Sequence, residues 1–157
     1  MKIELWYIGK TAFPYLKEGM QIYEKRLKKY FPFKTELIPD VKNARKMSPK
    51  ELKQKEGDLI LKKLKKEDFL ILLDEKGKEM SSVQFAAFLE KKLHHSHKRI
   101  IFQIGGAFGF SDEIYQRANS KLSLSKMTFS HQMIRLFVLE QLYRGMSILN
   151  NEPYHNE

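Results

Sequence analysis

Short hydrophobic runs alternate along the chain with longer segments in which hydrophobic residues step by three and four. The runs Phe69 to Leu73 and Ile100 to Ile104 are predominantly apolar, which is typical of strands buried on both faces of a parallel sheet. Between residues 3 and 7 apolar side chains alternate with others and predict a first strand that stops at Gly9. The strands predicted in this way are 3–7, 33–38, 69–73, 100–104 and 121–125.

The longer segments have the period of amphipathic helices. In the last of them Ile134, Val138, Leu142 and Met146 form one apolar stripe, and His131 and Arg135 share a different one. Near residue 48, the sequence Ser-Pro-Lys-Glu has the spacing of a capping box with proline at the first helical position. The predicted helices are 14–30, 49–64, 82–93, 111–118 and 131–149. Alternating strands and helices predict one α/β domain with a mainly parallel sheet flanked by helices.

Two of the predicted strands end where a ligand site is expected. Residues 74–78 are predicted to turn the chain after Leu73, and Gly105 and Gly106 follow the next strand. Glycines at this place let the backbone bend sharply and let a ligand approach main-chain atoms. Because carboxyl ends of parallel strands meet at one edge of the sheet, we expect Leu73 and Gly105 to lie side by side at a small-molecule site.

The basic residues are concentrated in the first part of the chain. The formal net charge is +10, and residues 1–66 contain 18 Lys and Arg against 8 Asp and Glu, whereas the remainder is neutral. Such a charge distribution attracts polyanions with little sequence preference. The segment 40–48 is predicted to be a mobile basic loop, and the lysines of the helix after it are candidates for contact with RNA. A solvated lysine face is the alternative interpretation of the same residues.

Several classes of protein are disfavoured by composition. The chain has no cysteine, so disulfides and thiolate-based metal sites are absent. The first residues do not resemble a signal peptide, and no apolar run approaches the roughly 20 residues that span a bilayer. A soluble cytoplasmic protein without membrane contact is therefore expected. His94, His95 and His97 suggest a metal site, but an exposed turn is the favoured interpretation, and no metal is predicted.

One stretch carries a specific resemblance. From residue 122 the chain reads Leu-Ser-x-Ser-Lys-Met-Thr-Phe-x-His-Gln-Met-x-Arg, preceded by Gly-Gly-x-x-Gly and followed by Glu-Gln-Leu-Tyr-Arg and a terminal Pro-Tyr-His. In this order the motifs resemble the RlmH family of small SPOUT-class methyltransferases, and the resemblance spans essentially the whole chain. The resemblance implies a C-terminal trefoil knot, S-adenosylmethionine as cofactor, and methylation of N3 of a pseudouridine in 23S rRNA of the large subunit or assembled ribosome. It also implies a homodimer packed through the long C-terminal helix, for which Phe137, Leu139 and Tyr143 are candidate contacts.

The resemblance also assigns site residues, position by position. The implied cofactor-binding residues are Leu73, Gly105, Leu124, Ser125, Lys126, Met127, Thr128 and Phe129. Because a uracil-type N3 carries a proton, methyl transfer needs a base or an electrostatic stabiliser. The candidates are His131 and His155, with Arg135 positioning phosphate or ring oxygens and Tyr154 contacting RNA. Ser130 and Asn156 stand where the family usually has proline and a basic residue.

Two other functions remain open at this point. A non-catalytic ribosome-binding or RNA-binding protein with the same fold would show the same basic surplus. A dinucleotide-binding or phosphate-binding α/β enzyme is disfavoured, because Gly105-Gly106-x-x-Gly109 is not the Gly-x-Gly-x-x-Gly fingerprint.

Overall fold

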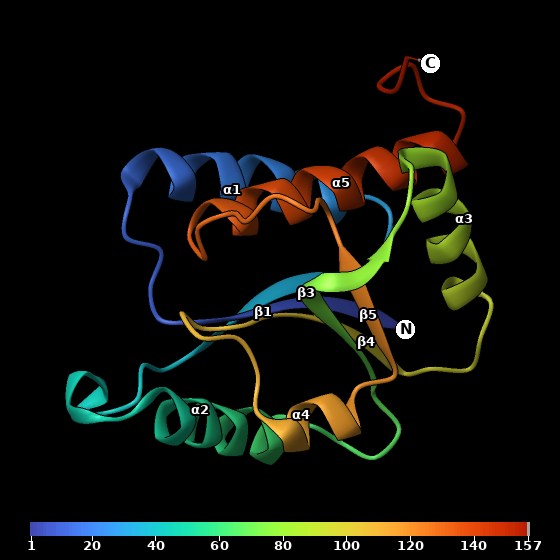
Figure 1. The fold of residues 1–157 in the computed structure, drawn as a ribbon. Coiled ribbons are helices and arrows are strands. Elements are labelled where there is room, and N and C mark those ends of the chain that lie inside the picture. The colour runs from blue at the N-terminus through green and yellow to red at the C-terminus, as the bar shows by residue number, and fades with distance from the viewer. Residues whose placement is uncertain (157) are drawn as a thin grey trace.

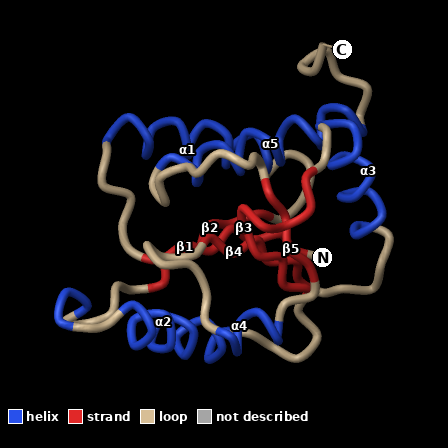
Figure 2. Tube along the Cα trace, viewed as in Figure 1, coloured by secondary structure: helices blue, strands red, loops and turns tan. Residues whose placement is uncertain are grey.

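The computed structural model describes residues 1–156, which form a five-stranded parallel sheet between two layers of helices (Figures 1 and 2). The strand order is β2-β1-β4-β3-β5. Helices α1, α3 and α5 cover one face, and α2 and α4 cover the other. The elements are β1 (Lys2–Ile8), α1 (Pro14–Leu27), β2 (Phe33–Ile38), the short 3-10 helix η1 (Ala44–Lys46), α2 (Pro49–Lys63), β3 (Phe69–Glu79), α3 (Ser82–Leu93), β4 (Arg99–Ile104), α4 (Asp112–Arg117), β5 (Ser120–Ser123) and α5 (Met133–Leu149). The α/β fold predicted from the hydrophobic pattern is confirmed.

The sheet separates two hydrophobic cores because successive side chains of a strand point to opposite faces. In β4, Ile100 and Phe102 pack with α1, α3 and α5, whereas Ile101 packs on the opposite side with α2 and α4. The strands β3 and β4 have side chains buried on both faces, as their apolar sequences predict. Register pairs Leu73 with Ile104, so Leu73 lies beside the carboxyl end of β4, as expected.

Serine side chains cap three of the helices. The hydroxyls of Ser48, Ser81 and Ser111 each accept a hydrogen bond from a backbone N–H in the first turn. Ser81 and Gln84 form a full capping box, and at Ser48 the structure shows the bond from the N–H of Glu51. These serines explain why three of the predicted helix starts agree with the structure.

The prediction of a turn at residues 74–78 is wrong. Strand β3 continues to Glu79, and its pairing with β5 shifts register between Leu73 and Lys78, both of which pair with Leu122. The four residues between them leave the ladder as an irregularity and then rejoin it. Their polar sequence favours exposure to solvent. From the sequence pattern alone, such an irregularity in a strand cannot be distinguished from a turn. The predicted strand 121–125 is likewise shorter, since β5 ends at Ser123, and the loop 40–48 contains η1.

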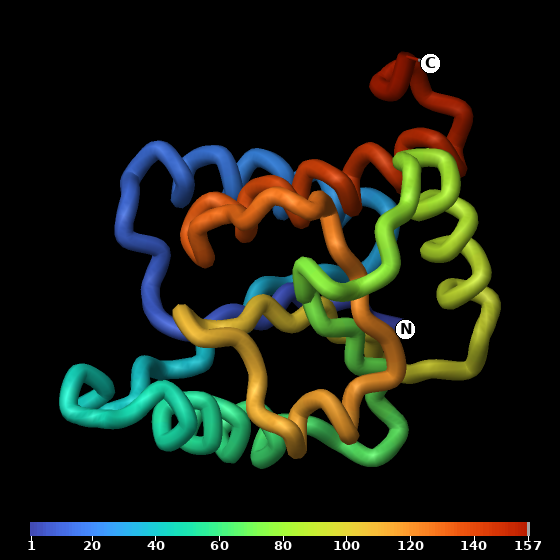
Figure 3. The backbone as a smooth tube through the Cα atoms, in the orientation of Figure 1, coloured from blue at the N-terminus to red at the C-terminus, as the bar shows by residue number. Residues whose placement is uncertain are grey.

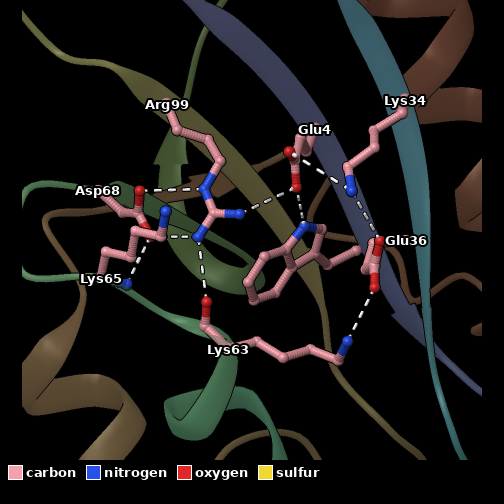
Figure 4. A network of polar contacts seen from close by, with 8 residues as sticks. Glu4, Lys34, Glu36, Lys63, Lys65, Asp68 and Arg99 are labelled. Atoms are coloured by element: carbon pink, nitrogen blue, oxygen red, sulfur yellow. Dashed lines mark hydrogen bonds and ion pairs between the residues drawn. The ribbon is translucent and has the colours of Figure 1, made fainter.

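An ion-pair network ties the beginnings of β3 and β4 to the middle of β1 (Figure 4). Arg99 holds Asp68 with two hydrogen bonds of 3.0 and 2.5 Å and lies 3.6 Å from the buried carboxylate of Glu4. The same Glu4 accepts a 2.6 Å hydrogen bond from the indole of Trp6. Burial alone would raise the pKa of Asp68, but the hydrogen bonds from Arg99 and the N–H of Lys65 outweigh burial and lower it.

Two further observations concern residues 1–156 only. None of the helices in this range combines the length and the apolar character needed to cross a bilayer. The same range contains no group of three or more His, Asp or Glu side chains arranged to hold a metal ion. His94 and His95 instead place Nδ1 next to the carbonyls of Glu90 and Lys91 at the end of α3.

Candidate functional site

A cavity of about 610 Å³ lies at the carboxyl-terminal edge of the sheet. Three segments line it: residues 73–76 of β3, the loop after β4, and the segment that leads from β5 into α5. These are the segments that the sequence predicts to surround a ligand, although they are widely separated along the chain. The lining residues are 73–76, 104–110, Tyr115, 122–125, 127–131 and Ile134.

The loop after β4 forms one wall of the cavity. Gly106 and Gly109 face each other as an isolated bridge, closed by a 3.2 Å hydrogen bond from the N–H of Gly109 to the carbonyl of Gly106. Gly109 has a φ of +84°, a conformation that glycine adopts without strain. The tight turn presents Phe108 at the rim, where 52% of this residue's surface is exposed. Backbone atoms of the glycines therefore border the cavity directly.

The segment after β5 forms the opposite wall and is held by short polar contacts. The hydroxyl of Ser125 accepts a 3.0 Å hydrogen bond from the N–H of Met127, and the hydroxyl of Thr128 donates to Glu75 at 2.9 Å. Ser130, which replaces the proline usual in the resembled family, accepts from the N–H of Met133 at the start of α5. Met127 is 77% exposed, so its side chain is available to a ligand.

The predicted cofactor-binding residues are largely brought together. All of them except Lys126 line the cavity, while Lys126 is exposed outside the lining. Their apolar members form a surface suited to a flat or aliphatic ligand group, and the backbone around them offers polar atoms. The cavity-lining members are Leu73, Gly105, Leu124, Ser125, Met127, Thr128 and Phe129.

Two carboxylates in the lining were missed by the sequence analysis. Asp74 and Glu75 lie in the irregular part of β3, and Asp74 accepts hydrogen bonds from the N–H of Lys76 and from the hydroxyl of Tyr115. Burial and the bond to Asp74 raise the pKa of Tyr115, so this phenol stays protonated. Negative charge at the cavity favours a ligand that carries a positive charge. The signal was available, since an acidic pair directly follows a buried strand.

The two candidate residues at the start of α5 occupy different environments. His131 is exposed and lines the cavity, which leaves its imidazole accessible to a bound molecule. Arg135 is only 1% exposed. Its guanidinium donates to the backbone carbonyls of Ile8, Gly9 and His131 and to the hydroxyl of Thr11. These bonds give Arg135 a structural role at the start of α5, and its expected contact with RNA phosphate or ring oxygens stays a prediction.

The chain that follows α5 ends away from the start of that helix (Figure 3). The helix has 17 residues and is therefore about 25 Å long. Tyr154 donates to Glu140 at 3.1 Å and its hydroxyl lies 3.0 Å from that of Tyr23, while Nδ1 of His155 is 3.1 Å from Arg144. Burial and these neighbours raise the pKa of Tyr154. Neither residue lines the cavity of its own chain.

Comparison with known proteins finds a family model and several relatives that match over nearly the whole chain. A family model described as "Predicted SPOUT methyltransferase" matches residues 1–155. A protein named "Ribosomal RNA large subunit methyltransferase H" from Parabacteroides distasonis is 57% identical over 157 residues, covering all of both chains. Proteins of the same name are 54% identical in Flavobacterium johnsoniae, over all of both chains, and 51% identical in Christiangramia forsetii, over 99% of each.

Proposed function

The chain belongs to the SPOUT methyltransferase family, and from this premise we propose that it transfers a methyl group from S-adenosylmethionine to N3 of a pseudouridine in large-subunit ribosomal RNA. The observation that carries the proposal is the cavity enclosed by the ends of β3 and β4 and the segment entering α5. We further propose that the chain acts as one domain in the cytoplasm, on the large subunit or the assembled ribosome. Membership of the family also implies a trefoil knot in the C-terminal part of the chain.

The residues of the cavity fit the proposed cofactor. The volume of about 610 Å³ falls in the range of about 300–1,000 Å³ that is typical of small-molecule sites. Leu73, Leu124 and Met127 would pack against the adenine and ribose, and backbone groups near Gly105 would bond their polar edges. Asp74 and Glu75 suit the positive charge of a sulfonium and an amino group.

The proposed chemistry divides between the cofactor and the protein. When bound, the cofactor supplies an electrophilic methyl group on a sulfonium sulfur. The sulfur then leaves as a neutral thioether, so the chain need not provide a metal. The chain must orient the acceptor nitrogen in line with that methyl group and remove its proton. His131 is the cavity-lining imidazole, and imidazole is a base at neutral pH. We propose that His131 is the base that removes the proton from N3.

The position of the tail supports a homodimer. Tyr154 and His155 do not line the cavity of their own chain, and their side chains contact Glu140 and Arg144 on α5. A two-fold axis perpendicular to α5 would place two copies of this helix antiparallel, with the carboxyl end of one beside the amino end of the other. In such a dimer the tail of each chain contributes to RNA binding or catalysis at the partner's cavity.

Exposed apolar residues indicate which face would form this dimer. Phe137 on α5 and Tyr15 and Ile22 on the adjacent α1 are exposed. Of the interface candidates taken from the sequence, Leu139 is excluded because it is fully buried inside its own chain, and Tyr143 is partly buried. A dimer through α1 and α5 would cover these apolar residues and double the basic area available to RNA.

Two measurements with the purified full chain test the proposed function. Calorimetry measures binding of S-adenosylmethionine, and mass spectrometry then measures methylation of pseudouridine in large subunits and in whole ribosomes from a strain that lacks the gene. Cofactor binding together with a new methyl group on the rRNA supports the proposal. No binding at millimolar cofactor would remove the methyltransferase assignment, whereas binding without methylation would favour the non-catalytic RNA-binding protein.

A further inference from the structure

A buried glutamate lies beneath the glycine loop of the cavity and has no role in the function proposed above. Glu56 lies on α2, in the helical layer below the sheet, and is 7% exposed. Its Oε1 is buried without a hydrogen-bond partner among residues 1–156. A Cβ added at Gly106 would lie 2.6 Å from this oxygen, so the carboxyl group packs directly against the loop backbone. Glu56 therefore contacts the back of a residue that lines the cavity.

The surroundings of Glu56 disfavour its charged form. Burying a carboxylate without a donor is costly, whereas a neutral carboxyl group is tolerated. Asp40, in the segment after β2, adds repulsion, the glycine loop has no titratable side chain, and α4 presents the neutral Ser111 near Gly57. Burial first, and Asp40 second, raise the pKa of Glu56 from 4.5 to about 7. The ionisation of Glu56 thus falls in the physiological pH range.

Close contacts leave the loop little room beside Glu56. A Cβ at Gly105 would lie 3.2 Å from the ring of Phe110, and a Cβ at Gly106 would overlap the carboxyl group of Glu56. Hydration of an ionised Glu56 requires space that Gly106 now occupies. A movement of the loop away from α2 would open space for water at the buried Oε1, and this displacement would change the wall of the cavity.

We propose that Glu56 is a positioning residue of the cofactor site, whose uncharged carboxyl group holds the 105–109 loop in the conformation that binds cofactor and whose ionisation displaces that loop. The inference rests on the proposed function, because it concerns the same cavity. Binding equilibria are reciprocal, so a cofactor that prefers the protonated form must also make Glu56 harder to ionise. Each direction of this linkage provides its own measurement.

The first measurement is the pH dependence of cofactor affinity. Calorimetry with S-adenosylmethionine compares the wild-type chain with Glu56→Gln and with Glu51→Gln, an exposed glutamate on the same helix. Between about pH 6 and pH 8.5 the affinity of the wild type and of Glu51→Gln should fall about tenfold relative to Glu56→Gln. Titration of the cofactor's own groups is common to all three proteins and cancels. Parallel pH profiles for all three proteins would overturn the inference and leave the proposed function intact.

The second measurement does not depend on catalysis and follows the ionisation in the wild-type chain itself. NMR of the wild-type chain with 13C-labelled glutamate side chains follows the ionisation of Glu56, with Glu56→Gln used only to assign the signal. A midpoint near pH 7 is expected without cofactor, rising by about one pH unit at saturation. A midpoint near the ordinary 4.5, or one that cofactor does not move, would overturn the inference. Absence of cofactor binding at every pH would instead count against the proposed function itself.

Discussion

Arg135 and Gly9 are joined by a 3.0 Å hydrogen bond from the guanidinium to the backbone carbonyl, which ties the start of α5 to the end of β1. The neighbouring carbonyl of Ile8 accepts from the same side chain at 2.8 Å, and the guanidinium lies over the ring of Tyr7. Burial lowers the pKa of Arg135 below its usual value. These bonds fix the turn that carries His131, so the cavity wall depends on a contact between residues 126 positions apart.

Replacing Arg135 should therefore destabilise the fold and the cofactor site together. In Arg135→Ala the carbonyls of Ile8 and Gly9 lose their donor, and the free energy of unfolding should fall by roughly 3 kcal/mol. Arg135→Lys keeps the charge without the planar set of donors and should have an intermediate effect. Urea denaturation and calorimetry with S-adenosylmethionine measure the two effects. Unchanged stability with weaker RNA binding would favour a direct contact of Arg135 with RNA.

The ion pair between Asp68 and Arg99 should make stability depend on pH in the acid range. Because the folded state lowers the pKa of Asp68, its stabilisation is fully present above the unfolded pKa of about 3.9 and is lost as pH falls through the folded value. At neutral pH Asp68→Asn should cost about 2 kcal/mol, and this difference from wild type should shrink in acid. Urea denaturation of wild type and Asp68→Asn at neutral and at acid pH provides the measurement.

The exposed neighbour Glu67 offers a matched control for that experiment. Glu67→Gln removes the same charge at the adjacent position without touching Arg99 and should change stability by less than about 0.5 kcal/mol. An equal effect of the two substitutions would mean that net charge, and not the bond to Arg99, is responsible.

The proposed dimer predicts complementation between two variants with impaired methylation. His131→Ala should abolish proton removal, and His155→Ala should lower methylation while sparing cofactor affinity. If the tail acts on the partner's cavity, a heterodimer of the two variants contains one cavity with both histidines intact. An equal mixture, refolded together to exchange subunits, should regain about a quarter of wild-type methylation, as random pairing requires.

The same mixture distinguishes the alternatives. A tail that acts on its own chain leaves both sites of the heterodimer incomplete, and the mixture would then be as inactive as its components. If His155→Ala also removed cofactor binding, the tail would contribute to the cofactor site rather than to the part of the site that binds the RNA.

Much of the fold could be predicted because its signals are local. The capping serines, the buried runs of β3 and β4 and the two glycines after Ile104 each report on neighbours within a few residues. The burial of Arg135 could not be predicted in this way, since its partners lie on β1. The continuation of β3 beyond Leu73 likewise depends on pairing with β5, which no local pattern of Asp, Glu and Lys encodes.

Gly77 tests that distant pairing, because it is the point at which β3 approaches the backbone of β5. A Cβ at this position would lie 2.7 Å from the backbone nitrogen of Leu122, and a backbone neighbour cannot move aside as a side chain can. Gly77→Ala should therefore lower the free energy of unfolding by about 3 kcal/mol and weaken cofactor binding, because Leu122 lines the cavity.

Gly109→Ala is the matched control, since nothing lies within 4 Å of its Cβ and only the φ of +84° opposes the substitution. It should cost about 1–2 kcal/mol. Urea denaturation measures both losses. A larger loss of stability in Gly109→Ala than in Gly77→Ala would show that the close approach of Gly77 to β5 does not constrain the fold.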